Sequence, residues 1–238
     1  MSLVNIPGFM IVMVGTMGAT MAAFPLSAAM GIPGGVIKAM TGTSGPEPAE
    51  MSEQLISMAD KARKEGLLSL EDDAQKITEP FARKGLMLMI DGTDPEALQS
   101  IMEIQMDGVA ARDAERVDFW KMASGFAPTL GVLGAVLGLV TVLSGLGGDV
   151  GELGHGIAVA FIATFYGVGA ANVWFLPIAM KLKAIAAEEA LVREMIMEGI
   201  LAIQSGDNPR IVKEKLESYL AAPVVPDESD DQSEAEAA

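Results

Sequence analysis

Ala127-Pro-Thr-Leu-Gly-Val-Leu-Gly-Ala-Val-Leu-Gly-Leu139 lies inside a longer stretch, residues 122–148, that contains no Asp, Glu, Lys or Arg. A second stretch without these residues follows at 153–180. Each is longer than the roughly 20 apolar residues that an α-helix needs to cross a bilayer. Only residues 149–152 separate the two stretches, which leaves room for a tight turn. The sequence therefore predicts two antiparallel transmembrane helices.

A third candidate span lies near the N-terminus. Residues 1–37 contain no charged side chain, and Lys38 is the first. A secretory signal would carry basic residues ahead of its apolar segment, so this region predicts a retained transmembrane helix over 6–30, loosened near Pro25. Its methionines are expected to be packing residues and not a metal path.

The composition agrees with a membrane protein. Of 238 residues, 50% are hydrophobic and 26 are glycine, and the mean hydropathy of +0.37 is high for a soluble domain of this size. Small residues let helices approach each other closely in lipid. Cysteine is absent, which excludes disulfides and thiolate metal sites, and no cofactor or metal is predicted. The net charge of −16 argues against nucleic acid, whose phosphates require a basic face.

The remaining residues predict helices outside the membrane. Residues 38–121 are expected to form a helical cytoplasmic domain after a Gly- and Pro-containing joint. Asp94-Pro95 is typical of a helix N-cap followed by proline at the first helical position, and that helix is expected to continue into the membrane. Residues 181–220 predict amphipathic helices and 221–238 an acidic disordered tail. No alternating strand pattern is present, so the predicted fold is all-α.

Lysines at the ends of the spans predict the orientation in the membrane. Lys38 follows the first span, Lys121 precedes the second, and Lys181 and Lys183 follow the third. The turn between the second and third spans carries only acidic charges. The sequence therefore predicts that the domain of residues 38–121 and the C-terminus both lie in the cytoplasm.

The predicted spans contain no carboxylate. Ionisable groups inside a membrane are costly and usually mark ion pathways, and the one candidate here is His155, near the outer end of its span. Such a histidine is more often a hydrogen-bonding residue at the interface than a proton acceptor. The chain is thus not expected to carry ions alone, and a second polypeptide would have to supply the acid.

Several stretches resemble flagellar motor stator proteins of the MotA type, in the order and spacing of that family. They are Gly15–Thr20 with Phe24-Pro25, Ala62–Glu71, Arg83–Leu86 with Asp91–Pro95, Ala127–Leu139, and Glu152–Ala158 with Ala163–Gly167 and Phe175–Pro177. The resemblance covers nearly all of residues 6–220. It also implies four spanning helices, and because this chain begins where the second would start, the first helix of the family is expected to be missing.

The resemblance implies an all-α integral membrane protein that forms a homopentameric ring. The ring would surround a MotB-type partner, each copy of which has one transmembrane helix bearing an Asp. Such stators of the bacterial inner membrane couple proton flow to torque on the rotor, and they are not enzymes.

The resemblance assigns the ion pathway to Thr164, Ala135 and Thr129. Thr164 matches a channel-facing threonine, whose hydroxyl would donate to the Asp of the partner or hold a water molecule in the pathway. The alternative is a hydroxyl that bonds to the carbonyl of its own helix four residues earlier. Ala135 stands where sodium-type stators carry a threonine, and since alanine offers Na⁺ no oxygen ligand, protons are expected.

Proline and glycine positions in the hairpin have both functional and structural interpretations. By resemblance, Pro128 and Pro177 would couple ion passage to movement of the cytoplasmic domain. The alternative is a simple helix bend at the membrane boundary. Gly131, Gly134 and Gly138 form a seam of small residues that predicts close helix packing.

Arg63 and Glu71 match a charged pair that, in the family, contacts the switch protein of the rotor. A solvated polar surface is the alternative. A different function is also open, a TolQ- or ExbB-like energiser that uses protons to drive an envelope-spanning partner. An inert membrane scaffold is a third possibility.

Overall fold

The computed structural model describes residues 5–25, 32–42, 47–144 and 150–221, and every regular element in these residues is a helix. The all-α prediction is confirmed for them. Backbone contacts divide the chain into two compact units. The first, here called the spanning unit, consists of Met1–Thr41 and Asp113–Lys183, and the second unit consists of Gly42–Arg112 and Ala184–Ala238.

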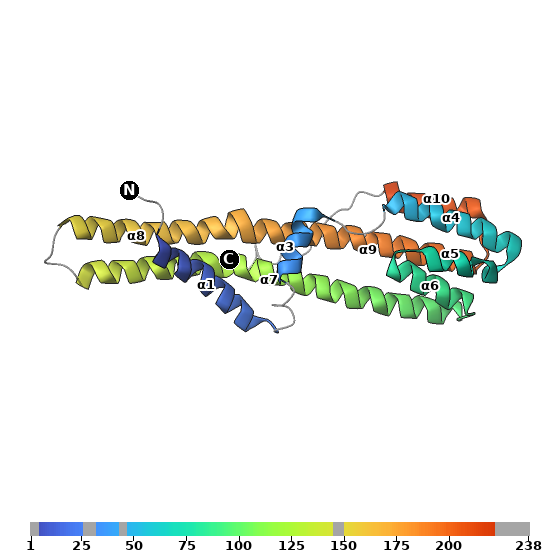
Figure 1. The fold of residues 1–238 in the computed structure, drawn as a ribbon, viewed down its shortest axis with the longest axis horizontal. Helices are drawn as coiled ribbons and strands as arrows, with labels where there is room; N and C mark the ends of the chain where they lie inside the picture. Colours follow the sequence, from blue (N-terminus) through green and yellow to red (C-terminus); the bar gives the residue numbers. More distant parts are fainter. Residues whose placement is uncertain (1–4, 26–31, 43–46, 145–149, 222–238) are drawn as a thin grey trace, which may run out of the picture. The chain divides into compact units, whose positions relative to one another are not determined.

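The spanning unit is built on the predicted hairpin (Figure 1). Its elements are α1 (Ile6–Ala23), α3 (Ile32–Thr41), the later part of α7 (Pro95–Ser144), α8 (Val150–Gly169), the π-helical turn η2 (Ala170–Phe175) and the start of α9 (Leu176–Gln204). The described residues contain three helices long and apolar enough to cross a membrane, Ile6–Ala23, Pro95–Ser144 and Gly156–Gln204. The prediction of three spans is confirmed.

The first span is shorter than predicted. α1 begins after Asn5, whose Oδ1 accepts a hydrogen bond of 2.7 Å from the N–H of Gly8, and it ends at Ala23 instead of residue 30. Phe24 is extended, with φ −116° and ψ 155°, because a proline disfavours the helical region for the residue before it. Pro25 therefore ends α1, and residues 26–30 of the predicted span lie outside the described part.

The long helices cross the predicted boundaries without a break. α7 starts as expected at Pro95, where Asp94 Oδ2 accepts from the N–H of Glu96 at 3.1 Å, and contains Pro128 in its interior. The helix predicted to end at residue 180 continues through Lys181 to Gln204, because charge marks an exit from lipid but does not interrupt backbone hydrogen bonds. The turn residues 145–149, the His155 side chain and the tail from residue 222 lie outside the described part.

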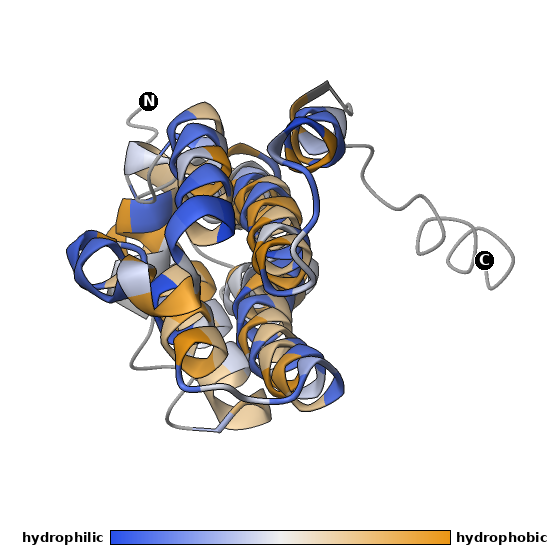
Figure 2. Cartoon of the chain, turned by 90° about the vertical axis from the view of Figure 1, so that its right-hand side faces the viewer, coloured by the Kyte–Doolittle hydropathy of each residue, from blue (hydrophilic) through white to orange (hydrophobic). Residues whose placement is uncertain are grey.

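The second unit packs amphipathic helices around its own core. Its elements are α4 (Pro48–Glu65), η1 (Leu67–Leu70), α5 (Glu71–Lys76), α6 (Pro80–Ile90), α10 (Pro209–Ala221) and the adjoining parts of α7 and α9. Their polar and apolar sides are visible in Figure 2. Fully buried side chains at the centre include Leu55, Leu86, Met102 and Ile196. This unit is thus held by side-chain burial, as in a soluble helical domain.

Candidate functional site

The hairpin helices α7 and α8 meet along a seam of small residues. A β-carbon placed on Gly131 would lie 3.1 Å from the carbonyl oxygen of Ala163 and 3.1 Å from the Cα of Gly167, and one on Gly138 would lie 3.3 Å from the Cβ of Ala160. Residue numbers rise along α7 as they fall along α8, so the helices are antiparallel. Only glycine and alanine allow this separation, and the predicted glycines 131, 134 and 138 all lie in the seam.

Helix α1 covers one flank of the seam. A β-carbon on Gly134 would lie 3.7 Å from Ile11, a side chain of α1. At the start of α1, the N–H of Asn5 donates to the hydroxyl of Tyr166 at 3.0 Å, and the ring of Phe9 meets that of Tyr166 edge-on at 5.8 Å. These contacts attach α1 to α8.

The opposite flank of the seam carries Ala135 and Thr164. Each follows a residue of the seam, Gly134 or Ala163, by one position, which is a rotation of about 100° around the helix. Because the helices are antiparallel, both rotations turn towards the same side, away from α1. Both residues are half-buried. They lie at one level, since the β-carbon position of Gly134 is 3.1 Å from the Cβ of Ala163.

We call this side of the hairpin the open flank and define it by two half-buried and three exposed residues. They are Ala135, Leu139, Ile157, Thr164 and Val168. Apart from the Thr164 hydroxyl, these side chains are apolar, and none is ionisable. The flank therefore offers an adjacent helix an apolar surface with one hydroxyl, and no acid of its own.

Thr129 does not join this group. It is exposed, and its hydroxyl donates to the Phe126 carbonyl at 2.7 Å. By helical position it lies on the side of α7 away from α8. Thr141 makes the same kind of bond, donating to the Leu137 carbonyl at 3.0 Å. The structure thus brings Thr164 and Ala135 together and leaves Thr129 apart.

The two prolines have different surroundings. Pro128 is half-buried inside α7. Pro177 is exposed and follows the π-helical turn η2, in which the N–H of Leu176 bonds to the carbonyl of Ala171. A proline in a helix lacks an N–H and clashes with the carbonyl four residues before it. The wider π turn gives that carbonyl more room, so η2 accommodates Pro177, and such turns are frequent at functional sites.

Arg63 and Glu71 are on the surface of the second unit. Arg63 lies in the last turn of α4 and Glu71 at the first position of α5, and both are exposed. Gly66, with φ +86°, reverses the chain between them, a backbone conformation that favours glycine. Neither side chain forms an ion pair with another described residue. Both charges are therefore available to a partner.

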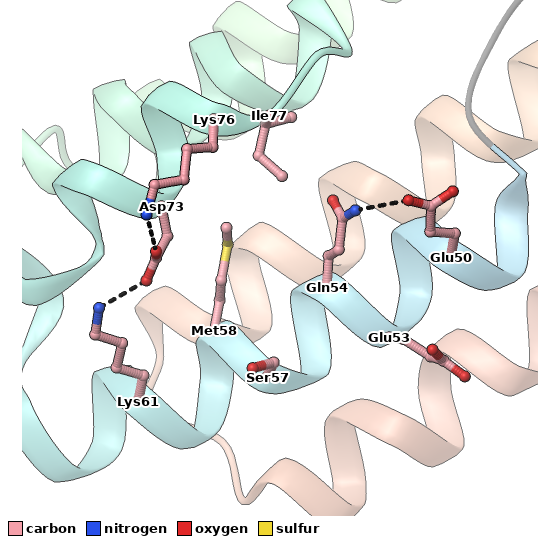
Figure 3. A pocket seen from close by; sticks show the side chains of 9 residues that line it. All are labelled: Glu50, Glu53, Gln54, Ser57, Met58, Lys61, Asp73, Lys76 and Ile77. Carbon is pink, nitrogen blue, oxygen red and sulfur yellow. Dashed lines mark hydrogen bonds and ion pairs between the residues drawn. The ribbon is translucent and has the colours of Figure 1, made fainter.

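A hollow of about 440 Å³ lies between α4 and α5, and Lys61 and Asp73 are among the side chains that line it (Figure 3). At one end Lys61 donates to Asp73 at 2.6 Å, and Lys76 donates to the same carboxylate at 3.2 Å. Hydrogen bonds from Lys61 and then Lys76 hold the pKa of Asp73 below its usual value. The hydrogen bond to Asp73 correspondingly raises the pKa of Lys61. This pair joins α4 to α5 and so helps to position Arg63 relative to Glu71. Within the described ranges, no cluster of three His, Asp or Glu side chains is placed to hold a metal ion.

Residues 73–195 match the MotA/TolQ/ExbB proton channel family. The chain belongs to this family. Among curated relatives, Motility protein A of Borreliella burgdorferi is 44% identical over 166 residues, which are 70% of this chain and 64% of the relative. Motility protein A of Bacillus subtilis is 34% identical over 226 residues, covering 93% of this chain and 82% of the relative. Chemotaxis protein PomA of Vibrio alginolyticus is 36% identical over 174 residues, covering 73% and 68%.

Solved structures extend the similarity to the fold. The structure of C. jejuni MotAB matches with a TM-score of 0.87 at 29% identity, covering 94% of this chain and 88% of that chain. The flagellar MotAB stator complex from Bacillus subtilis matches with a TM-score of 0.85 at 33% identity, covering 92% and 85%. The resemblance to MotA-type stators is thereby confirmed.

Three features of the site were not predicted from the sequence. They are the bond between Asn5 and Tyr166, the π-helical turn, and the ion pair between Lys61 and Asp73. The first and third join residues far apart in the chain, for which no local pattern exists. Pro177 was the one available signal for the turn, because a helix that accepts an internal proline must relieve the clash it causes.

Proposed function

We propose that this chain is the ion-conducting stator subunit of a bacterial flagellar motor, and that it couples proton flow across the inner membrane to torque on the rotor. The observation that carries the proposal is the open flank, an apolar surface with one hydroxyl and no acid. The similarity of the chain to one component of the MotAB stator complex of Bacillus subtilis also supports the proposal. A surface of this kind becomes a pathway only when a second chain brings an ionisable group.

The proposed partner is a MotB-type protein with a single transmembrane helix that bears an Asp. Packed on the open flank, its carboxylate would reach the level of Thr164, whose hydroxyl would donate to the ionised form. Protonation would remove that charge-assisted bond, which is stronger than a bond between neutral groups. Each cycle of protonation and deprotonation would thus alternate between a stronger and a weaker contact of the Asp with Thr164. Such a difference in contact energy is what allows one chain to shift against the other.

Protons are proposed as the coupling ion. A sodium ion must exchange its hydration shell for several oxygen ligands, and the open flank supplies only the Thr164 hydroxyl at the level of Ala135. A proton needs only a relay between a water molecule and a carboxylate. Thr129 stays a predicted pathway residue, although it faces away from this flank within the chain.

The subunit is proposed to act as a homo-oligomeric ring of multi-pass membrane proteins, with the second unit and the C-terminus in the cytoplasm. Movement of the hairpin would pass through the helix segments at Pro128 and Pro177. Arg63 and Glu71, both exposed, would contact complementary charges on the switch-complex protein of the rotor. Charge pairs suit a contact that must form and break quickly. The TolQ- or ExbB-like alternative is less favoured, because the relatives described above are motility proteins.

Reconstitution tests this proposal directly. Vesicles containing the chain with a MotB-type partner should acidify internally under a potential, and vesicles with the chain alone should not. Thr164→Val keeps the size of the side chain but removes its hydroxyl, and it should reduce the proton flux, whereas Thr164→Ser should retain much of it. Thr141→Val, which removes a hydroxyl that bonds within its own helix, is the matched control. Substantial flux through the chain alone would overturn the proposal.

A further inference from the structure

Helix α3 lies across the spanning helices at one level (Figure 1). A β-carbon on Gly35 would lie 3.5 Å from Trp120 Nε1 on α7 and 3.7 Å from Leu182 Cδ1 on α9. Val36 and Ala39 pack against the buried cluster that contains Trp120 and Leu182. One face of α3 therefore packs against α7 and α9, at the level where the uncharged stretches of these two helices end.

The other face of α3 is apolar and has no cover among the described residues. Ile37 is 61% exposed and Met40 is 83% exposed. A helix that lies across membrane-spanning helices and carries apolar side chains on its outer face has the geometry of an interfacial helix, with those side chains inserted between headgroups and acyl chains. Ile37 and Met40 are thus placed to contact lipid.

Lysines gather at this level. Lys121 is next to Trp120, Lys181 and Lys183 stand on either side of Leu182, and Lys38 is three residues beyond Gly35. In residues 32–41, 117–124 and 176–183 the only acidic side chain is Asp118. This excess of positive charge is local, because the chain as a whole carries −16.

The two lysines of α9 are the best placed. Lys181 and Lys183 are exposed, and neither forms an ion pair with a described residue. Between them Leu182 is buried, so both ammonium groups are attached to a fixed piece of backbone. Lysine is a compact charge that binds phosphate as a point charge, and its long stem lets the ammonium group reach the headgroup layer.

We propose that α3 and these lysines form a binding site for the phosphate headgroups of anionic phospholipids in the cytoplasmic leaflet of the membrane. Ile37 and Met40 insert beside the lipid chains, and Lys38, Lys121, Lys181 and Lys183 hold the phosphate. The site would anchor the spanning unit at a fixed depth. It depends on insertion into a membrane and not on ion conduction or on a rotor.

The test measures which lipid the full-length chain retains. The protein, in its natural oligomer, is placed in nanodiscs containing equal amounts of phosphatidylglycerol and phosphatidylethanolamine, then released gently and analysed by native mass spectrometry. The expected result is a preference for phosphatidylglycerol that weakens at high salt. The variant Lys181→Gln with Lys183→Gln should lower that preference by roughly twenty-five-fold, since each lysine near a membrane surface contributes a factor of about five.

Matched variants complete the design. Lys181→Arg with Lys183→Arg keeps the charge and should keep the preference, which separates charge from folding. Lys64→Gln with Lys84→Gln removes two exposed lysines of the second unit and should change nothing. Equal retention of both lipids by the unaltered protein, or an unchanged preference in the double glutamine variant, would overturn the proposal. A glutamine variant that loses its oligomeric state without losing the lipid preference would do so too, by assigning the lysines to a protein contact.

Discussion

The Cα of Gly167 lies so close to α7 that a β-carbon there would stand 2.6 Å from the carbonyl oxygen of Ala127. Backbone lies on both sides of this contact, so no flexible side chain can move away to make room. The separation of α7 and α8 is therefore set by this glycine.

Gly167→Ala should loosen the hairpin. Forcing a methyl group into a packed contact typically costs about 1–3 kcal/mol, so the thermal unfolding temperature of the purified protein in detergent should fall. Gly169→Ala is the matched control, because a β-carbon there meets no atom within 4 Å and alanine favours a helix over glycine by about 0.5–1 kcal/mol. If both variants unfold at the same temperature, the seam does not set the helix separation.

Pro177→Ala should let the π turn relax towards a regular α-helix, since the clash that the turn relieves is gone. We expect slower amide hydrogen exchange in residues 170–177 and reduced swimming speed at normal expression. Pro209→Ala is the control, because Pro209 is the first residue of α10, where a proline costs little. Unchanged exchange in η2 would show that packing, and not the proline, produces the turn.

Charge reversal should distinguish residues that contact the rotor from other charged residues on the surface. Arg63→Glu and Glu71→Lys each leave the folded core untouched, because both side chains are exposed, and each should strongly reduce swimming. Proton flux in vesicles with a MotB-type partner should remain normal. Arg112→Glu applies the same change to another exposed arginine and should swim normally. Equal motility of all three variants would contradict a rotor contact at these residues.

The ion pair between Lys61 and Asp73 should make the stability of the second unit depend on pH. Hydrogen bonds from Lys61 and Lys76 lower the pKa of Asp73 below its usual 3.8. The folded state therefore gains stability from this carboxylate above that pH, and loses it as the pH falls towards the lowered pKa. Asp73→Asn should unfold at a lower temperature than the unaltered protein near neutral pH, and the difference should shrink below about pH 4.

Asp72→Asn is the control for that experiment. Its carboxylate is exposed and forms no ion pair with a described residue, so its removal should leave the unfolding temperature nearly unchanged. A constant difference between Asp73→Asn and the unaltered protein across the acid range would mean that the pair contributes through packing and not through charge.

Much of the fold was predictable because its signals are local. The uncharged stretches predicted the three spans, and the Asp94-Pro95 cap predicted where α7 begins, since a cap needs only neighbouring residues. The end of α1 was missed by several residues, although Pro25 had already been noted. A proline disfavours the helical conformation in the residue before it. This effect of Pro25 ends α1, even though the sequence beyond it remains apolar.

The candidate site was only partly predictable. Thr164, Ala135 and the glycines came from the resemblance and from spacing, and the structure places them in and beside one seam. Thr129 came from the same reasoning and lies elsewhere. The flank on which a residue lies depends on how α1 packs against the hairpin, through contacts such as the one between Asn5 and Tyr166, 161 positions apart. No local pattern records such a contact.

The glycine seam also decides whether protons can pass between α7 and α8. A water molecule needs a cavity of about one probe sphere with polar partners, and between Gly131 and Gly167 the two backbones already touch. The contact between α7 and α8 at these two glycines therefore leaves no room for a water molecule. Under the proposed function, a proton would therefore cross the membrane along the open flank, between this chain and its partner, and not between α7 and α8.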